Sequence, residues 1–261
     1  MNIIVTVKQV PNTSEIKIDP VTNTLKRDGV PSIINPDDKA ALEEALVLKD
    51  KYGARVTAVC MGPAQADKAL REALAMGADC AVLISDRAFA GSDTLATSKI
   101  LAAAISKLGY DLIICGRQAI DGDTAQVGPQ IAEHLNIPQV TYVQKIDYNK
   151  ANGEFTVTRW YEEYTQTIAV VGPALFTVLS GANKPRYMRV AGIVAQDGMQ
   201  VENVAFADLD VKLEEIGLKG SPTRVKSTFT KLAAGGGQKY ELAPKEAAAL
   251  IAEQLKSKLY I

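Results

Sequence analysis

The sequence has few of the residues on which side-chain catalysis depends. Its 261 residues include one histidine, His134, and three cysteines, Cys60, Cys80 and Cys115. A single histidine nearly excludes a Ser-His-Asp triad or a histidine-bound metal ion, and no two cysteines form a CxxC pair. The G-x-S-x-G elbow, the G-x-G-x-x-G fingerprint after the first predicted strand and the G-x-x-x-x-G-K-S/T loop are also missing. If the chain takes part in chemistry, we expect a bound cofactor to carry it.

Charge and hydropathy argue against two further classes of protein. The chain has 29 Lys and Arg and 30 Asp and Glu residues, a net charge of -1, whereas a nucleic-acid-binding protein needs a basic face. No apolar run approaches the length of a membrane span, so we expect no membrane insertion and no signal peptide. The cysteines lie in or at the end of apolar stretches, which indicates buried thiols in a reducing cytosol and predicts a cytoplasmic protein.

Apolar runs alternate with helical patterns in the first half of the chain. The runs Ile3–Val10, Val56–Met61, Ala81–Ile84, Leu112–Cys115 and Val140–Val143 predict strands. The segments Ala40–Tyr52, Ala66–Ala75, Leu95–Leu108 and Ala125–Leu135 have apolar residues at three- and four-residue spacing and predict helices. Short apolar strands separated by helices indicate a parallel sheet covered on both faces. We therefore predict an α/β fold with a doubly wound, mostly parallel sheet.

Two hairpins and a C-terminal arm are expected around this sheet. Residues 15–30 alternate about a turn and predict a hairpin arm, and Asn152-Gly153 predicts a second hairpin that extends the sheet with antiparallel strands. After Ser180 the periodicity decays until a final helix, expected from Pro244 to about Leu259. We expect an α/β domain over residues 1–205 and an extended C-terminal arm over residues 206–261 that wraps a partner.

The loop after the fourth predicted strand is the strongest signal of a site. Gln118, Asp121, Asp123 and Thr124 lie between that strand and a helix expected to begin at Ala125, where α/β sheets bind ligands. Unpaired N–H groups at a helix start suit a phosphate; the two carboxylates would then form turns or contact a ribose or a ring. A metal ion is a second reading, although the spacing and closing Glu of a calcium loop are missing. A purely structural turn is the third.

Three other strand-to-helix junctions belong to the same predicted edge of the sheet. They are the segments Met61–Pro63, Ser92–Thr97 and Asn35–Asp38. Asp93 or Ser92 is a natural N-cap, and Thr94 and Thr97 share one helix face. Ordinary capping explains each junction alone, whereas four such loops at one edge favour a ligand.

Five motifs, in this order, resemble the beta subunit of electron-transfer flavoproteins. They are VKQVP, NPDDKAALEEAL, GPAQADKALREALAMGAD, GRQAIDGDTAQVGPQIAEHL and NKPRY. The resemblance covers nearly the whole chain. It implies a Rossmann-like, adenine-nucleotide-binding domain in a heterodimer with an alpha subunit that holds a redox FAD. In ordinary members the beta subunit holds a structural AMP.

The stretch GSDTLATS, from Gly91 to Ser98, resembles an electron-bifurcating subgroup. That subgroup holds FAD where the others hold AMP. The resemblance implies that this FAD takes a hydride from NADH, sends one electron to ferredoxin or flavodoxin, and sends the other through the alpha-subunit FAD to an acyl-CoA dehydrogenase of the butyryl-CoA type, as in anaerobic fermentation. Hydroxyl groups on a helix face would hydrogen-bond to the polar edge of a flavin ring, whereas AMP alone would leave them without a ligand to bind.

The resemblance also implies the binding residues. Those carried over to the nucleotide site are Lys8, Val10, Asn35, Asp38, Met61, Gly62, Asp93, Thr94, Thr97, Gly116, Gln118, Asp121, Gly122, Asp123, Thr124, Ala125, Gln126 and Val127. Residues 180–196 resemble the partner-recognition segment, and the residues carried over there are Asn183, Pro185, Arg186, Tyr187 and Val190. Val190 stands where a larger Leu is usual. A surface loop with one exposed apolar side chain is the plainer reading of that segment.

Two alternative functions remain open. The chain could be a scaffold that holds AMP only to complete its fold, as in an ordinary electron-transfer flavoprotein. It could also be an ATP-hydrolysing nucleotide-binding domain, which would need a metal-bound triphosphate. Neither alternative gives the chain acid–base or nucleophilic residues of its own.

Overall fold

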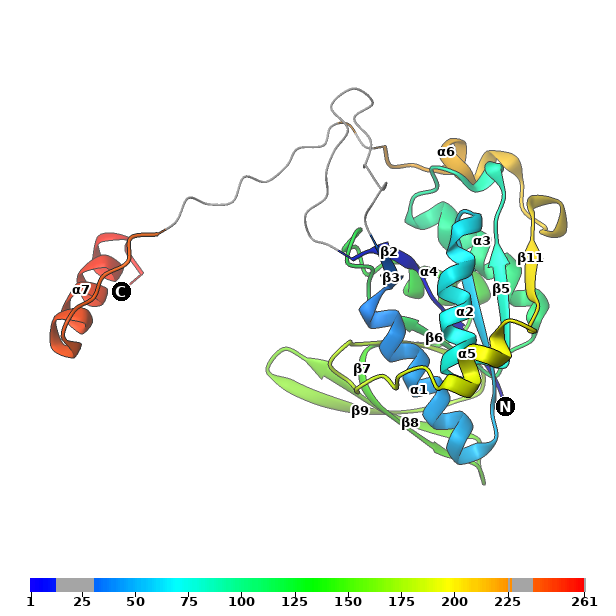
Figure 1. The fold of residues 1–261 in the computed structure, drawn as a ribbon, viewed down its shortest axis with the longest axis horizontal. Coiled ribbons are helices and arrows are strands. Elements are labelled where there is room, and N and C mark those ends of the chain that lie inside the picture. Colours follow the sequence, from blue (N-terminus) through cyan, green and yellow to red (C-terminus); the bar gives the residue numbers. More distant parts are fainter. Residues whose placement is uncertain (13–30, 225, 227–236, 261) are drawn as a thin grey trace. The chain divides into compact units, whose positions relative to one another are not determined.

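The computed structural model describes residues 1–12, 31–224, 226 and 237–260 of the chain (Figure 1). Its contacts divide the chain into two units, residues 1–227 and 228–261. The hairpin arm predicted for residues 15–30 lies outside the described residues. In the second unit, α7 (Pro244–Ser257) forms with a proline in its first turn and has no buried residue. No helix in the described part of the chain is both long and apolar enough to cross a membrane.

A nine-stranded sheet forms the centre of the first unit, in the order β11-β5-β4-β1-β6-β10-β7-β8-β9. The strands are β1 (Asn2–Thr6), β4 (Arg55–Met61), β5 (Cys80–Ile84), β6 (Leu112–Gly116), β7 (Gln139–Asn149), β8 (Glu154–Tyr161), β9 (Tyr164–Val171), β10 (Ala174–Val178) and β11 (Val201–Val204). Strand pairing is parallel from β11 to β7, and β8 and β9 continue the sheet in antiparallel pairs. The predicted doubly wound, mostly parallel fold is confirmed, as is the antiparallel extension at Asn152-Gly153.

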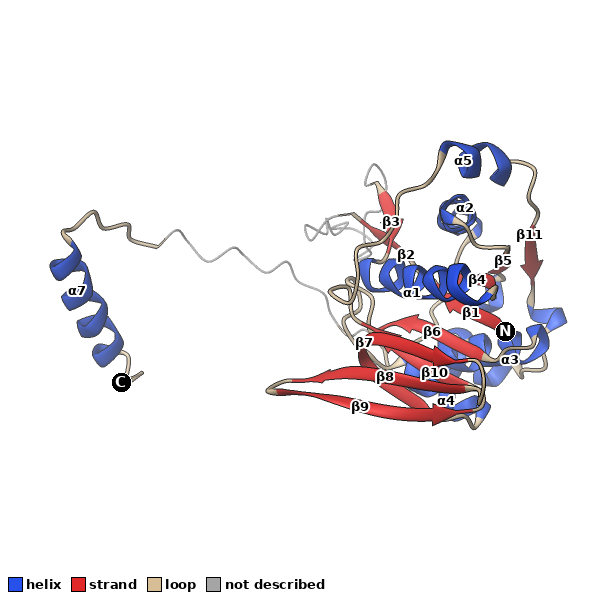
Figure 2. Ribbon diagram, turned by 90° about the horizontal axis from the view of Figure 1, so that it is seen from below, coloured by secondary structure: helices blue, strands red, loops and turns tan. Residues whose placement is uncertain are grey.

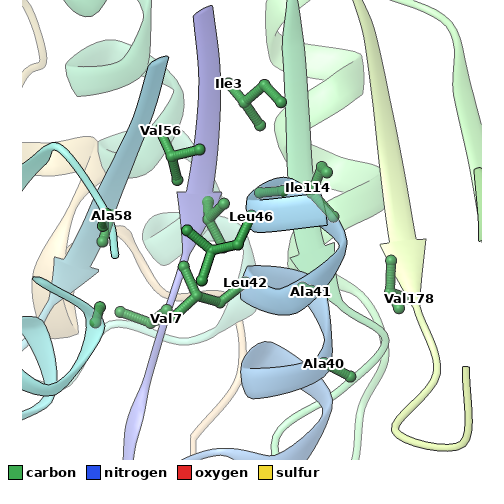
Figure 3. Packing of buried hydrophobic residues seen from close by; sticks show 14 of the residues in the cluster. Ile3, Val7, Ala40, Ala41, Leu42, Leu46, Val56, Ala58, Ile114 and Val178 are labelled. Carbon is green, nitrogen blue, oxygen red and sulfur yellow. The ribbon is translucent and has the colours of Figure 1, made fainter. Parts of the chain in front are cut away.

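Helices cover both faces of the sheet, as Figure 2 shows. One face carries α1 (Pro36–Tyr52) and α2 (Asp67–Met76), and the other carries α3 (Thr94–Leu108) and α4 (Val127–Leu135). Alternate side chains of the buried strands supply both cores: Ile3 packs with the first pair of helices and Ile4 with the second. In Figure 3, Leu42 and Leu46 of α1 lie between that helix and the strands.

Local sequence explains where the helices begin and end. Pro36 occupies the first turn of α1, where its missing N–H costs nothing. Gly53 ends α1 in a left-handed conformation, at φ 70°. Asp93, one of the two N-cap candidates, caps α3 by accepting hydrogen bonds from the N–H groups of Leu95 and Ala96.

Two details differ from the sequence-based expectations. The run Ile3–Val10 is not one strand: β1 ends at Thr6, and β2 (Gln9–Pro11) pairs antiparallel with β3 (Ser32–Ile34) in a separate sheet. The fourth helix begins at Val127 rather than at Ala125, because Ala125 has a left-handed backbone, at φ 53°.

The irregular region after Ser180 contains regular elements that the sequence did not indicate. They are the short helix α5 (Val190–Gln196), the strand β11 at the sheet edge, the turns η3 (Phe206–Asp208) and η4 (Leu213–Glu215), and α6 (Gly217–Gly220). Leu209 and Ile216 are buried in the core beside α3. Residues 206–224, expected to belong to the C-terminal arm, therefore lie largely against the α/β unit.

The α1 core gives a direct test of the fold. Leu46 is 1% exposed, and Leu46→Ala should lower the free energy of unfolding by about 2–5 kcal/mol, because the cavity left by a deleted side chain adds to the lost transfer energy. Urea denaturation measures this loss. Leu213, which is 48% exposed, supplies the control, since Leu213→Ala should change the unfolding free energy far less. Equal losses in the two variants would contradict the packing described.

Candidate functional site

A cavity of about 350 Å3 opens beyond the carboxyl ends of β1, β4 and β6. The N-terminal ends of α3 and α4 form its opposite wall. The predicted site residues that line it are Lys8, Asp38, Met61, Asp93, Thr94, Thr97, Gly116, Gln118, Gly122, Thr124, Ala125, Gln126 and Val127. Two of the four predicted loops thus meet at this cavity through several residues each. The Met61–Pro63 loop reaches it through Met61, and the Asn35–Asp38 loop through Asp38.

The Asp38 carboxylate joins two strand ends at the base of the cavity. One of its oxygens accepts the N–H of Lys8 at 2.8 Å and the other accepts the N–H of Gly116 at 3.1 Å. A Cβ atom at position 116 would lie 2.2 Å from Asp38 Oδ1, so only glycine fits there. The ends of β1 and β6 are therefore held together by one buried side chain.

Burial sets the protonation of Asp38. Removal from water raises the pKa of this carboxyl from 3.8 to about 7, against the lowering effect of hydrogen bonds from Lys8, Asn35 and Gly116, and neighbouring Asp37 raises it further. Burial likewise raises the pKa of the Cys115 thiol, on the cavity wall, to about 12. A thiol with that pKa is protonated at neutral pH and is no nucleophile.

Asn35 fastens the loop that follows β6. Its buried side-chain amide donates to the Gln118 carbonyl at 2.8 Å, and its oxygen accepts the Ile120 N–H at 3.0 Å. Its own backbone N–H donates to the Lys8 carbonyl at 2.9 Å. Asn35 does not line the cavity; it fixes the two loops that do.

The rest of that loop is held in an uncommon conformation. Asp123 and Ala125 both have positive φ, at 54° and 53°. Asp123 does not line the cavity and accepts a hydrogen bond from the Gln118 side chain. A non-glycine residue in this region costs energy and marks a backbone held for a reason other than its own preference. The loop therefore presents Thr124 and Gln126 in a fixed arrangement at the start of α4.

The two helix starts that face the cavity differ in their capping. Asp93 occupies the N–H groups at the start of α3, whereas no side chain caps α4, whose N-cap position is Gln126. The free N–H groups and the positive end of the helix dipole at α4 suit an anionic group. Thr94 Oγ1 donates to Gln126 Oε1 at 2.9 Å and joins the two helix starts.

A second cavity, of about 460 Å3, adjoins the first and shares Lys8 and Met61 with it. The predicted residues Val10, Gly62 and Asp121 line this second cavity. The Lys8 ammonium lies 2.7 Å from an Asp121 carboxylate oxygen and joins the first loop to the loop after β6. This ion pair is partly exposed and contributes little energy by itself.

Sequence reasoning missed several residues of the first cavity. They are Thr6, Val7, Val59, Ser92, Leu101, Cys115, Ala119 and Gly128. Most belong to strand ends or to the inner face of α3, and the predicted strand boundaries already contained the signal for some of them. The importance of Gly128 could be recognised only from the fold, since a Cβ there would lie 2.7 Å from the Thr177 side chain.

The predicted partner-recognition segment divides into residues that anchor it and residues that are exposed. Asn183 donates to the Ala40 carbonyl at 3.0 Å, and Arg186 forms a two-point ion pair with Glu43 on α1. Tyr187 and Val190 are 88% and 80% exposed. Pro185 lies between these groups, half-buried.

Carboxylates in the described part of the chain do not gather into a metal site with histidine or cysteine. In the loop after β6, Asp121 pairs with Lys8, and Asp123 accepts a bond from Gln118. Both carboxylates therefore have partners within the loops, so the structure gives no support to the metal reading.

Comparisons with known proteins agree with one another. Residues 22–209 match the electron transfer flavoprotein domain. The chain is 55% identical over 261 residues to the electron transfer flavoprotein subunit beta of Clostridium acetobutylicum, with all of both chains covered. It is 51% identical over 242 residues to the caffeyl-CoA reductase-Etf complex subunit CarD of Acetobacterium woodii, covering 91% of each chain. It is 48% identical over 268 residues to the acryloyl-CoA reductase electron transfer subunit gamma of Anaerotignum propionicum, covering 99% of each.

The buried carboxyl at the base of the cavity predicts a dependence of stability on pH. With a folded-state pKa of about 7 against an ordinary 3.8, folded Asp38 keeps a proton that the unfolded chain has lost between those pH values. Its contribution to stability therefore falls as pH rises from about 4 to 7, by up to about 1.4 kcal/mol per pH unit.

The substitution Asp38→Asn removes this titration. The difference in unfolding free energy, variant minus wild type, should rise with pH between about 4 and 7 and level off above. Urea denaturation across that pH range measures it. The exposed Asp210 provides a control in Asp210→Asn. A difference for Asp38→Asn that does not change with pH would show that the carboxyl is not held protonated.

Proposed function

Because the chain belongs to the electron transfer flavoprotein family, as a beta subunit, we propose that its cavity holds FAD and serves electron bifurcation. In this proposal the complex takes a hydride from NADH and divides the two electrons between ferredoxin or flavodoxin and, through the FAD of an alpha subunit, an acyl-CoA dehydrogenase. The observation that carries the proposal is the uncapped start of α4, which lies beside Thr94 on the cavity wall that also carries Thr97.

The residues present fit the adenosine-diphosphate part of FAD. The free N–H groups at Val127 and Gly128 suit a phosphate, and no carboxylate points to them as a cap. Thr124 and Gln126 flank that position and offer hydroxyl and amide groups. A flavin ring supplies hydride and one-electron chemistry that the side chains of this cavity lack.

We propose a more specific position along the nucleotide for Thr94 and Thr97 than the sequence alone suggests. Thr94 is hydrogen-bonded to Gln126, the N-cap of α4, which supports a place for it beside the position proposed for the phosphate. We therefore place Thr94 and Thr97 along the chain that links phosphates and ring rather than only at the ring edge. The Thr97 hydroxyl can donate to a phosphate oxygen, and both hydroxyls can accept hydrogen bonds from ribityl hydroxyls.

The main alternative is a structural AMP in the same cavity. A volume of about 350 Å3 lies at the low end of ligand pockets and favours this smaller nucleotide. The adjoining cavity of about 460 Å3 favours FAD, because it gives room for the second half of a dinucleotide. The site does not support an ATP-hydrolysing function, because it offers no free pair of carboxylates for a metal-bound triphosphate.

The exposed apolar side chains support the proposed partners. In α7, Ile251 and Leu255 lie four residues apart and are exposed by 60% and 36%, and Leu259, just after the helix, is exposed by 90%. This suits a helix that packs on another protein. We propose that this arm contacts the alpha subunit. Two relatives carry names of CoA-ester reductase complexes, which supports an acyl-CoA dehydrogenase as the partner of the segment around Tyr187 and Val190.

The nucleotide content of the heterodimer tests the cofactor. After acid release, the purified complex should yield two FAD and no AMP per heterodimer. One FAD with one AMP would overturn the proposal in favour of the structural nucleotide. The paired substitution Thr94→Ala and Thr97→Ala should weaken retention of the second FAD. Ser106→Ala, at the far end of α3, should leave retention unchanged because Ser106 bonds only to its own helix.

A charge placed on the exposed segment tests the partner surface. Val190→Glu should slow electron transfer to the acyl-CoA dehydrogenase by about tenfold or more, since burying an unpaired charge in an interface is costly. Val171→Glu, at a side chain 65% exposed on β9, is the matched control. Steady-state turnover with the dehydrogenase measures both. If the two variants transfer electrons equally well, Val190 is not part of the docking surface.

A further inference from the structure

Residues 216–223, which we name the return segment, pack closely against the loop that leads into α3. Gly217 has φ 60°, and a Cβ there would lie 2.2 Å from the Ala88 carbonyl oxygen. On the other side, Gly91 has φ 77°, and a Cβ there would lie 3.3 Å from the Leu218 side chain. Both glycines permit an approach that larger residues would block. Ile216, next to Gly217, is buried in the core beside α3.

Hydrogen bonds join the return segment to Gly91, Ser92 and Asp93, the three residues before α3. The Gly217 N–H donates to Ser92 Oγ at 3.1 Å, and the Asp93 N–H donates to Ser221 Oγ at 2.8 Å. Ser221 is 6% exposed and donates its own hydroxyl to the Gly217 carbonyl at 2.7 Å. This contact joins parts of the chain about 130 residues apart, and it is formed by polar groups with defined partners.

Asp93 divides its carboxylate between the helix and the return segment. Oδ1 accepts the N–H groups of Leu95 and Ala96, each at 3.1 Å. Oδ2 accepts the Thr223 N–H at 3.0 Å and the Thr223 hydroxyl at 2.8 Å. Burial would raise the pKa of Asp93, but these four hydrogen bonds outweigh it and hold that pKa below its usual range. Hydrogen bonds to an ionised acceptor are the stronger kind.

We propose that Ser221 and Thr223 are positioning residues of the nucleotide site, which hold Asp93 and thereby fix where Thr94 and Thr97 face the cavity. The inference rests on the proposed nucleotide site but not on which nucleotide it holds. Thr94 follows Asp93 directly and bonds to Gln126. Hydrogen bonds thus link Thr223 to Asp93, and Thr94, the next residue in the chain, to the start of α4.

This arrangement gives Asp93 a role different from direct ligand contact. Both of its oxygens already have two donors each, so its carboxylate has little capacity left for a ligand. Its place on the cavity wall comes from the turn that it stabilises. By linkage, a nucleotide that immobilises the start of α3 must also stabilise the contact between Asp93 and Thr223.

The test uses the heterodimer and the variants Thr223→Val, Thr223→Ser and Thr165→Val. Thr223→Val keeps the shape and the N–H donor but loses the hydroxyl, and it should raise the dissociation constant for FAD, or for AMP, about fivefold or more. Thr223→Ser restores the hydroxyl and should bind like the wild type. Thr165 is exposed on β9, so Thr165→Val should have no effect.

Amide hydrogen exchange gives a second measurement, in which the two variants are compared without nucleotide. The amides of Leu95 and Ala96 should exchange faster in Thr223→Val than in Thr165→Val, since both donate to Asp93. In the wild type, adding nucleotide should slow exchange at the Thr223 amide. Equal exchange in the two variants, or equal nucleotide affinity, would overturn the inference.

These results separate the inference from the proposed function. If the wild type holds AMP and not FAD, the proposed function fails while the same comparison proceeds with AMP. If Thr223→Ser binds as weakly as Thr223→Val, the hydroxyl is not the cause and the inference fails whatever the nucleotide.

Discussion

The rest of the site depends on the carboxylate of Asp38. It is buried at the start of α1 and accepts one N–H from the end of β1 and one from the end of β6. Neighbouring strands of a parallel sheet diverge into separate loops at their carboxyl ends, and nothing in the strands themselves keeps those loops together. A shared acceptor does so, and its burial disfavours the charged form, which raises the pKa of Asp38. The glycine at position 116 follows from this contact.

The cavity offers groups that can hold and orient a ligand, but its own side chains have little capacity for acid–base or nucleophilic chemistry. The Cys115 thiol is protonated. The Asp38 carboxyl, at the base of the cavity, accepts two backbone hydrogen bonds, and the Asp93 carboxylate accepts hydrogen bonds from both α3 and the return segment. What remains free is one helix start and a set of hydroxyl and amide groups. Such a site suits a phosphate-bearing ligand in one direction, because α3 is capped and α4 is open.

The sequence predicted what depends on short-range periodicity. The strands β4, β5 and β6 and the four main helices follow from apolar spacing, and the cap at Asp93 follows from residue type. It could not predict the left-handed Ala125, since that conformation is imposed by neighbouring structure rather than by alanine's preference. The strand β11 has one fully buried residue in four, too few to show a period. The contact between Asp93 and Thr223 spans 130 residues and leaves no local pattern.

The same helix that holds the site also holds the exposed segment after Ser180. Asp37, next to Asp38, accepts the Ser180 N–H at 3.0 Å and lies 3.4 Å from Arg117, the residue after β6. Further along α1, Glu43 binds Arg186. Polar side chains of the segment thus bond to α1, whereas the Tyr187 side chain is left exposed to solvent. Side chains of α1 therefore fix both ends of the proposed electron path in this chain: the cavity that would hold the nucleotide and the surface that would meet a partner.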